Sequence, residues 1–254
     1  MAQAAETVVL RPETVLAFDT HIGQAETALD ETLRDDRQFL WSDGSPERMA
    51  QLRKGATIVE FWSGKHAIQV PEGLIHDWIG ATCVPGATME KTLALLQDYD
   101  NHKNVYHPEV IGSKTIRRQG GDFQIYLRLR KKKVITVILD TDHDARYFAS
   151  DAARWSCHTH TTRISEVEHA GRPAERALPP DTGHGFLWRL NSYWRFAEKD
   201  NSVVIECRAI SLTRAVPKAL AWIIEPMVDK LPKESLKATL EATRRALVSP
   251  AARA

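Results

Sequence analysis

Cysteine is scarce in this chain of 254 residues, and that scarcity excludes two kinds of architecture. The three cysteines, Cys83, Cys157 and Cys207, are odd in number and far apart in the sequence. A disulfide framework requires paired cysteines, and a cysteine-rich metal site requires them at close spacing. We therefore expect three buried thiols that behave as small hydrophobic side chains.

A strong net charge and a long apolar run are also absent. The 34 basic and 33 acidic residues give a formal net charge of +1, so bulk electrostatics favours no nucleic-acid partner. Residues 1–10 lack the basic start and apolar stretch of a secretory signal, and no window reaches the ~20 apolar residues of a membrane span. As written, the chain is expected to be soluble and cytoplasmic, or exported if a signal segment has been removed.

Catalytic and cofactor motifs are missing as well. The sequence contains no evident Ser-His-Asp set, glycine-rich phosphate loop or nucleotide-binding motif. His158-Thr159-His160 would place two imidazoles on one face of a strand, with His143, His169 or His184 nearby in sequence, but no carboxylate is tied to them. A solvated strand face is the simpler interpretation. We predict neither a metal nor another cofactor.

The best-defined pattern that is present lies near the C-terminus. Side chains alternate over 186–196, so that the even-numbered residues form an apolar face. The polar stretch 198–201 predicts a turn, and 203–213 predicts the returning strand of a hairpin. Pairing Ala197 with Ser202 would set large side chains on one strand against small ones on the other. That apolar face requires a hydrophobic cover.

The segment that follows the hairpin supplies the cover. From Pro217 to Leu231, apolar residues recur at the spacing of one buried helix face, and a second stripe runs over 236–247. Pro226 removes one backbone hydrogen bond and predicts a kink. Pro232 predicts the start of a second helical segment. We expect a long, broken C-terminal helix.

Residues 1–72 predict a smaller, largely helical region. Apolar residues recur at helical spacing over Pro12–Leu33. Ser45-Pro46-Glu47 combines a cap, a first-turn proline and a first-turn acid, which predicts a short second helix. Phe39-Leu40-Trp41 is expected to anchor this region on the main body, because an exposed cluster of that size would invite association. Residues 56–71 predict a hairpin.

The middle of the chain is dominated by strands. A strand over 73–84 precedes a helix capped by Thr88, and alternating segments fill most of 110–168 before a long loop over 169–185. This order of one strand, one helix, about six antiparallel strands and a long terminal helix favours a curved antiparallel sheet around that helix.

One hairpin in this middle region defines a second apolar face. If 122–130 and 134–140 pair, one face of the hairpin carries Phe123, Ile125, Leu127 and Leu129 together with Ile138. Such a face would oppose the terminal helix.

The element order resembles that of the START-like helix-grip superfamily, which includes polyketide cyclases and lipid-transfer proteins. The resemblance rests on PGATMEKTLALLQDYDNHKNVYHPEV and on RAVPKALAWIIEPMVDKLPKESLKATLEATRRAL. It covers residues 73–248 and implies an α+β helix-grip fold, a curved antiparallel sheet wrapped around a long C-terminal helix. Residues 1–72 would form an N-terminal extension of two helices and a hairpin packed on that domain.

The resemblance also implies a deep apolar cavity that holds a hydrophobic small molecule or lipid. The candidate wall residues are Phe123, Ile125, Leu127, Ile138, Trp188, Trp194, Ile205, Ile223 and Met227. Each also fits plain core packing, because apolar periodicity does not distinguish a hollow interior from a filled one. Non-enzymatic binding for carriage, storage or sensing is the leading hypothesis, with no catalytic residue assigned.

Two alternatives stay open. Tyr193 opposite Glu206, flanked by Arg195, would enolise a carbonyl compound in a cyclase, aromatase or dehydratase if this face lined the cavity. On the outside, the same residues would form a cross-strand charge ladder. The third hypothesis is a scaffold in which the N-terminal helices, or the basic tip 128–133, bind another protein. That tip would also allow transient contact with an anionic membrane. Oligomeric state is not predicted.

Overall fold

The computed structural model describes residues 7–33, 38–62, 64, 66–132, 136–215 and 221–248, with side chains placed for all of these except 33 and 221–229. The helices are α1 (Pro12–Leu33), α2 (Pro46–Arg53), α3 (Met89–Gln97), α4 (His102–Val105) and α5 (Ala221–Val248), with 3-10 turns η1 (Trp41–Gly44) and η2 (Tyr99–Asn101). The strands are β1 (Val8–Val9), β2 (Thr57–Phe61), β3 (Ile68–Val70), β4 (Gly73–Pro85), β5 (Val110–Gln119), β6 (Asp122–Lys132), β7 (Thr136–Ala149), β8 (Arg154–Glu168), β9 (Arg176–Ala177), β10 (Thr182–Gly183), β11 (Arg189–Lys199) and β12 (Ser202–Arg214).

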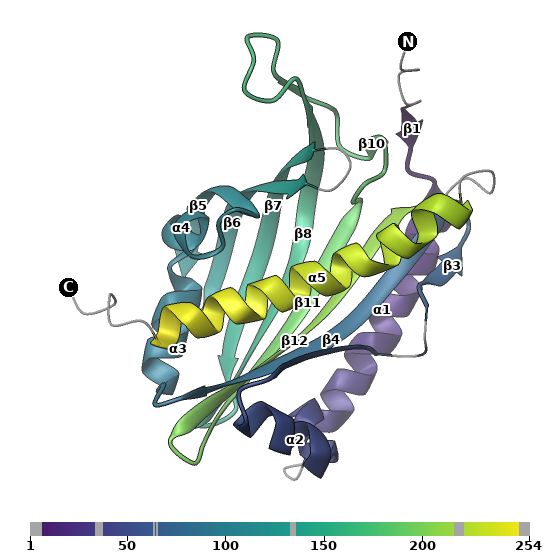
Figure 1. Cartoon of the computed structure of the whole chain (residues 1–254). Helices are drawn as coiled ribbons and strands as arrows, with labels where there is room; N and C mark the ends of the chain where they lie inside the picture. The colour runs from purple at the N-terminus through teal and green to yellow at the C-terminus, as the bar shows by residue number, and fades with distance from the viewer. Residues whose placement is uncertain are drawn as a thin grey trace.

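One large antiparallel sheet dominates the described part of the chain. Its order is β2-β4-β12-β11-β8-β7-β6-β5, with β3 also paired to β4 and β9 to β8, and a separate pair joins β1 to β10. The sheet curves, and α5 crosses its concave side (Figure 1). We call the side toward α5 the inner face and the opposite side the outer face. The predicted α+β helix-grip arrangement is confirmed.

The outer face is covered by α1, which lies behind the sheet in Figure 1. Phe18, Ala25 and Leu29 of α1 are buried in one cluster with Ile210 of β12. The helix predicted over Pro12–Leu33 and its apolar stripe are therefore confirmed. The division of the chain at residue 72 stays a prediction. β2, which precedes that point, hydrogen-bonds to β4 within the main sheet.

The segment between α1 and β2 is anchored as the sequence predicts. Phe39 and Leu40 are buried against Leu52 of α2 and the outer side of β4 and β12. The Ser45 hydroxyl caps α2 by accepting the backbone N–H of Arg48. The cap satisfies one of the unpaired N–H groups at the helix start.

The hairpin of β11 and β12 has the predicted faces but a different register. Lys199 pairs with Ser202, two residues from the predicted pairing, so Trp194 lies opposite Cys207. The turn consists of residues 200–201 alone, both with positive φ, the geometry of a tight two-residue hairpin loop. A shift of two residues keeps the side chains of β11 and β12 on their predicted faces.

The same shift pairs the outer-face polar residues differently. Tyr193 lies opposite Arg208, and Arg195 lies opposite Glu206, so the predicted pairing of Tyr193 with Glu206 is wrong. All four side chains are buried, with at most 9% of their surface exposed. They form a polar layer beneath α1 and the segment that follows it, in place of a solvated charge ladder.

β6 and β7 pair as predicted, but the predicted register is wrong by one residue. The predicted face of β7 is therefore also wrong. Leu129 pairs with Leu139, and Ile125 pairs with His143. The odd-numbered residues of β7 therefore share the face of Ile125, and Ile138 lies on the outer face. A slip of one residue moves every side chain to the other side of a sheet.

The predicted hairpin over residues 56–71 is wrong. β2 and β3 both pair with β4, at Thr57–Thr82 and Val70–Gly73 respectively. β4 spans 13 residues, so its edge is long enough to hold both short strands in succession.

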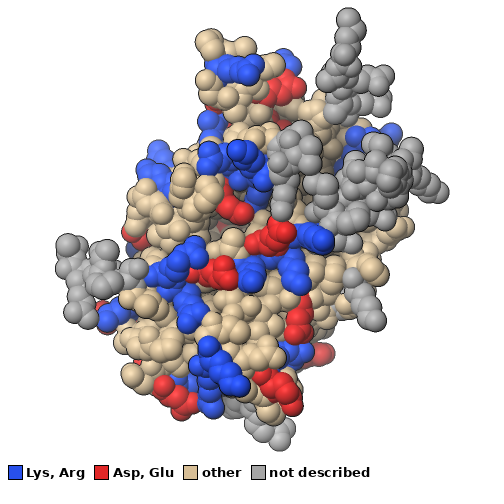
Figure 2. All heavy atoms as spheres, viewed as in Figure 1, with Lys and Arg blue, Asp and Glu red and all other residues tan. Residues whose placement is uncertain are grey.

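α5 is one continuous helix from Ala221 to Val248 that includes Pro226 and Pro232, so the predicted division into two segments is wrong. A proline removes one backbone hydrogen bond, and here the turns on either side persist. The predicted start at Pro217 lies outside the described residues. Lys, Arg, Asp and Glu side chains are interspersed over the face that carries α5 (Figure 2). None of the helices in the described ranges combines the length and apolar character that a membrane crossing requires.

Candidate ligand cavity

A cavity of about 730 Å³ lies between α5 and the inner face of the sheet. Side chains from β6, β7, β8, β11 and β12 line its floor, and side chains from α5, α3 and α4 line the opposite wall. The aromatic residues of the lining are Trp78, Tyr99, Tyr106, Tyr147, Phe186, Trp194 and Phe196. About half of the remaining lining residues are aliphatic.

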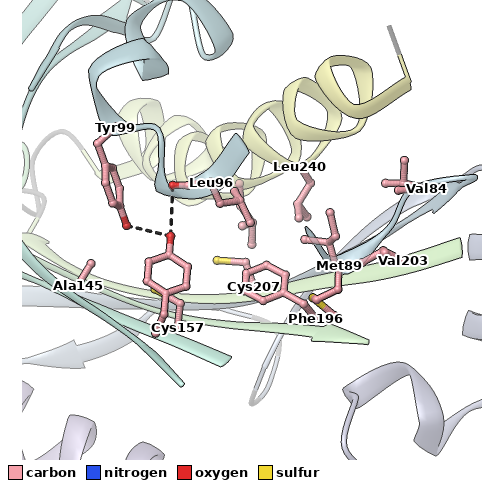
Figure 3. Packing of buried hydrophobic residues seen from close by; sticks show 14 of the residues in the cluster. Val84, Met89, Leu96, Tyr99, Ala145, Cys157, Phe196, Val203, Cys207 and Leu240 are labelled. Carbon is pink, nitrogen blue, oxygen red and sulfur yellow. Dashed lines mark hydrogen bonds between the residues drawn. The ribbon is translucent and has the colours of Figure 1, made fainter. Parts of the chain in front are cut away.

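The cavity forms because the contacts of α5 with the rest of the fold lie mainly on either side of the space. α5 packs on β2, β4 and β12 and on α3 and α4. Leu240 lies directly over Gly80 of β4, where a Cβ atom would come within 2.7 Å of the leucine side chain. Figure 3 shows Leu240 of α5 and Leu96 of α3 reaching down toward the sheet. β11, β8 and β7 lie beyond the close contact with β4 and form the open floor.

Short side chains keep the middle of the floor open. Ala209, Ser192 and Thr159 are paired across β12, β11 and β8 and therefore form one row across the sheet. All three line the cavity, and all three are only half-buried although their strands are central ones. In a close-packed core, such positions would retain almost no accessible surface.

Three of the predicted wall residues line the cavity. They are Ile125 and Leu127 of β6 and Trp194 of β11. Phe123 and Ile205 are fully buried in the main inner core cluster and do not belong to the cavity lining.

Of the other four predicted wall residues, two lie on the outer face and two lie outside the described side chains. Trp188 packs on the outer face with α1, because β11 begins at Arg189 and the alternation does not extend back to residue 188. Ile138 lies on the outer face for the register reason given above. Ile223 and Met227 lie in the part of α5 whose side chains are not described.

A long C-terminal helix over a hollow in a curved antiparallel sheet is the arrangement that the sequence resemblance implied. The fold is an α+β helix-grip arrangement.

Comparison with solved structures gives matches at low sequence identity. A protein from Thermus thermophilus is 13% identical and matches with a TM-score of 0.49, over 69% of this chain and 98% of its own. A STAR-related lipid transfer protein from Xanthomonas axonopodis is 16% identical (TM-score 0.47; 72% and 98%). The Zhui aromatase/cyclase from a Streptomyces species is 12% identical (TM-score 0.48; 70% and 98%). No family model and no curated protein matches the sequence.

Two tyrosines join α3 to the wall of the cavity. The Tyr147 hydroxyl donates to the Leu96 carbonyl at 3.2 Å, so the Tyr99 hydroxyl donates to Tyr147 at 2.9 Å (Figure 3). This chain of hydrogen bonds satisfies both buried hydroxyls within an otherwise apolar region.

Burial keeps the polar interior of the cavity uncharged at neutral pH. Loss of hydration lowers the pKa of His143 and of His102 to about 4. The same effect raises the pKa of Tyr106, and that of the Cys157 thiol, to about 12. Charged side chains lie at the rim, where Lys131 pairs with Glu109.

The histidines considered for a metal site are separated by the sheet. Thr159 lines the cavity, so its neighbours His158 and His160 lie on the outer face, whereas His143 lies on the inner face. The described residues contain no cluster of three or more histidine, cysteine or acidic side chains that could hold a metal ion.

Sequence reasoning did not identify the polar residues of the floor. His143 was considered only as a metal ligand, and Ser192 and Thr159 were not singled out. The alternation of Leu139, Thr141 and His143 contains the necessary signal. That signal becomes usable only when the pairing of β7 with β6 is known.

Proposed function

We propose that the chain binds a hydrophobic small molecule or lipid in the cavity under α5, for carriage, storage or sensing. The observation that supports this most directly is an apolar space of about 730 Å³ with an uncharged interior. Cavities of roughly 300–1,000 Å³ hold drug-sized ligands. Burying roughly 300 Å² of apolar ligand surface contributes about 7.5 kcal/mol at 25 cal/mol per Å², before the costs of association.

The cyclase-type alternative is supported less well. Tyr193 and Glu206, its predicted residues, lie on the outer face beneath α1 and the segment after it. His143 and Tyr147 do line the cavity, but a histidine with a pKa of about 4 is a weak base at pH 7, and burial raises the pKa of Tyr147. Proton transfer is most efficient when the pKa of the group lies near the working pH. The geometry therefore favours binding over acid–base chemistry.

Filling the floor is expected to weaken binding without destabilising the fold. Ala209→Phe places a ring above the row of short side chains, where space is available. We expect the affinity for the fluorescent apolar probe 1-methoxypyrene to fall at least tenfold, and the midpoint of thermal unfolding to be unchanged or higher. Fluorescence titration and thermal denaturation measure the two effects.

The control makes the same replacement at an exposed alanine. Ala174→Phe lies in the loop after β8 and is expected to bind the probe as the unmodified chain does. Native mass spectrometry of gently purified protein should also show a bound hydrophobic molecule that Ala209→Phe lacks. Equal affinity in the two variants, or no saturable binding to the unmodified chain, would contradict the proposal.

A further inference from the structure

His143 is the histidine that β7 contributes to the floor of the cavity, and one of its two ring nitrogens is already bonded. The ring is 4% exposed and lines the cavity. Its Nε2 atom lies 2.8 Å from Oγ1 of Thr141, two residues earlier on the same face of β7. If Nε2 donates the proton in this hydrogen bond, the other ring nitrogen, Nδ1, is unprotonated in the neutral ring.

A second hydrogen bond of Thr141 identifies the donor. Its hydroxyl donates to the backbone carbonyl of Leu127 on β6, at 3.0 Å. A hydroxyl carries one proton, so Oγ1 acts as the acceptor toward His143. The imidazole therefore carries its proton on Nε2. Nδ1 is left with a lone pair, and no described residue donates a hydrogen bond to it.

The neutral form of the ring follows from its surroundings. His143 pairs with Ile125 on one side and with Thr161 on the other, and Ile125 is fully buried. Burial lowers the pKa of the ring to about 4, so the second nitrogen stays unprotonated at pH 7. Nδ1 is thus a hydrogen-bond acceptor in an apolar cavity.

Hydroxyl groups lie in the neighbouring row of the floor, because Thr159 pairs with Ala145, two residues after His143 on β7. Thr159 and Ser192 are paired across β8 and β11, and both line the cavity. The indole N–H of Trp194 donates to Ser192 Oγ at 3.2 Å, which leaves the Ser192 proton available. The polar part of the floor thus combines Nδ1, which can only accept in this tautomer, with hydroxyl groups, which can donate or accept, and none of these groups is charged.

We propose that the natural ligand carries a hydroxyl group that donates to Nδ1 of His143, so that the cavity selects a neutral hydrophobic alcohol or phenol. The proposal rests on the proposed binding function. It assigns His143 to ligand selection and Thr141 to a positioning role, in which its hydroxyl holds the imidazole tautomer. A ligand with a carboxylate or only ether oxygens at this point would leave the acceptor without a donor.

The test compares two probes that differ in one donor. 1-Hydroxypyrene has the proton, and 1-methoxypyrene has the same ring system without it. We expect the unmodified chain at pH 7 to bind the hydroxyl probe about three- to tenfold more tightly, the range of one net hydrogen bond. His143→Phe should bind both probes with equal affinity, and Leu139→Met, a volume-conserving change at another cavity residue of β7, should keep the preference.

The tautomer provides a readout that is independent of any ligand. Nitrogen-15 NMR of the histidine rings is expected to show His143 protonated at Nε2 and bare at Nδ1, and Thr141→Val should remove this fixed state. Absence of saturable binding of either probe to the unmodified chain would contradict the binding function itself. Binding of both probes with no hydroxyl preference in the unmodified chain, or a proton on Nδ1, would overturn this inference while leaving the binding function intact.

Discussion

Replacing Asp77 with alanine is expected to lower the free energy of unfolding by about 3–5 kcal/mol, the cost of leaving a buried charge without its partner. Asp77 is 3% exposed on the outer face and accepts two hydrogen bonds from the equally buried Arg208, at 2.9 and 2.6 Å. His21 of α1 adds a third contact at 2.9 Å. Burial alone would raise the pKa of Asp77, but these partners lower it overall. Urea unfolding measures the loss.

Two further variants separate this effect from a general loss of packing. Arg146→Ala removes an exposed ion pair with Asp122 and should leave stability unchanged within error. The double variant Asp77→Leu with Arg208→Met replaces the buried pair by apolar side chains and should be more stable than Asp77→Ala. If the single variant loses less than about 1 kcal/mol, the ion pair does not have the importance assigned to it here.

Acid is expected to unfold the protein well above the pH at which carboxylates alone would cause unfolding. Burial lowers the pKa of His76, His102 and His143 to about 4, against about 6.5 in an unfolded chain. Between these pH values the histidines are protonated in the unfolded chain but neutral in the folded chain. The free energy of unfolding therefore falls as pH falls from about 6.5 to about 4. Each histidine contributes up to about 3 kcal/mol, and together they give a slope of about 4 kcal/mol per pH unit.

The slope can be assigned to individual residues. Urea unfolding at several pH values between 7.5 and 4 should show His143→Phe with a slope lower by about 1.4 kcal/mol per pH unit, because one proton-linked group is gone. His160→Ala, whose side chain is 56% exposed, should retain the original slope. An unchanged slope in His143→Phe would show that this imidazole is not held neutral by burial.

Local signals in the sequence predict the helices of this fold well. The stripe over Pro12–Leu33 and the cap at Ser45 depend on residues a few positions apart, and both are confirmed. The order of strands and the long C-terminal helix are confirmed for the same reason. Strand register is different, because it depends on the geometry of each turn. Residues 200–201 form a tighter loop than predicted, which shifted one hairpin by two residues without changing its faces.

The candidate site was predictable in outline only. Element order led to a cavity beneath the last helix, but periodicity treats a lining residue and a core residue alike. Trp194 lines the space and Ile205 is buried beside it, although both recur at the spacing of one strand face. Ile138 was placed on the wrong face by a slip of a single residue. His143 and its acceptor nitrogen depend on a three-residue contact that only the folded chain assembles.

β5 ends the main sheet on one side. The Asp100 carboxylate accepts the backbone N–H of Thr115 there, and the rest of this edge has a consequence for behaviour at high concentration. A bare row of N–H and C=O groups is a template on which a strand of another molecule can assemble. Lys114, Arg117 and Arg118 are exposed on this strand, so two copies that approach edge to edge bring like charges together. Electrostatic repulsion at this edge opposes fibril-like stacking of sheets from different molecules.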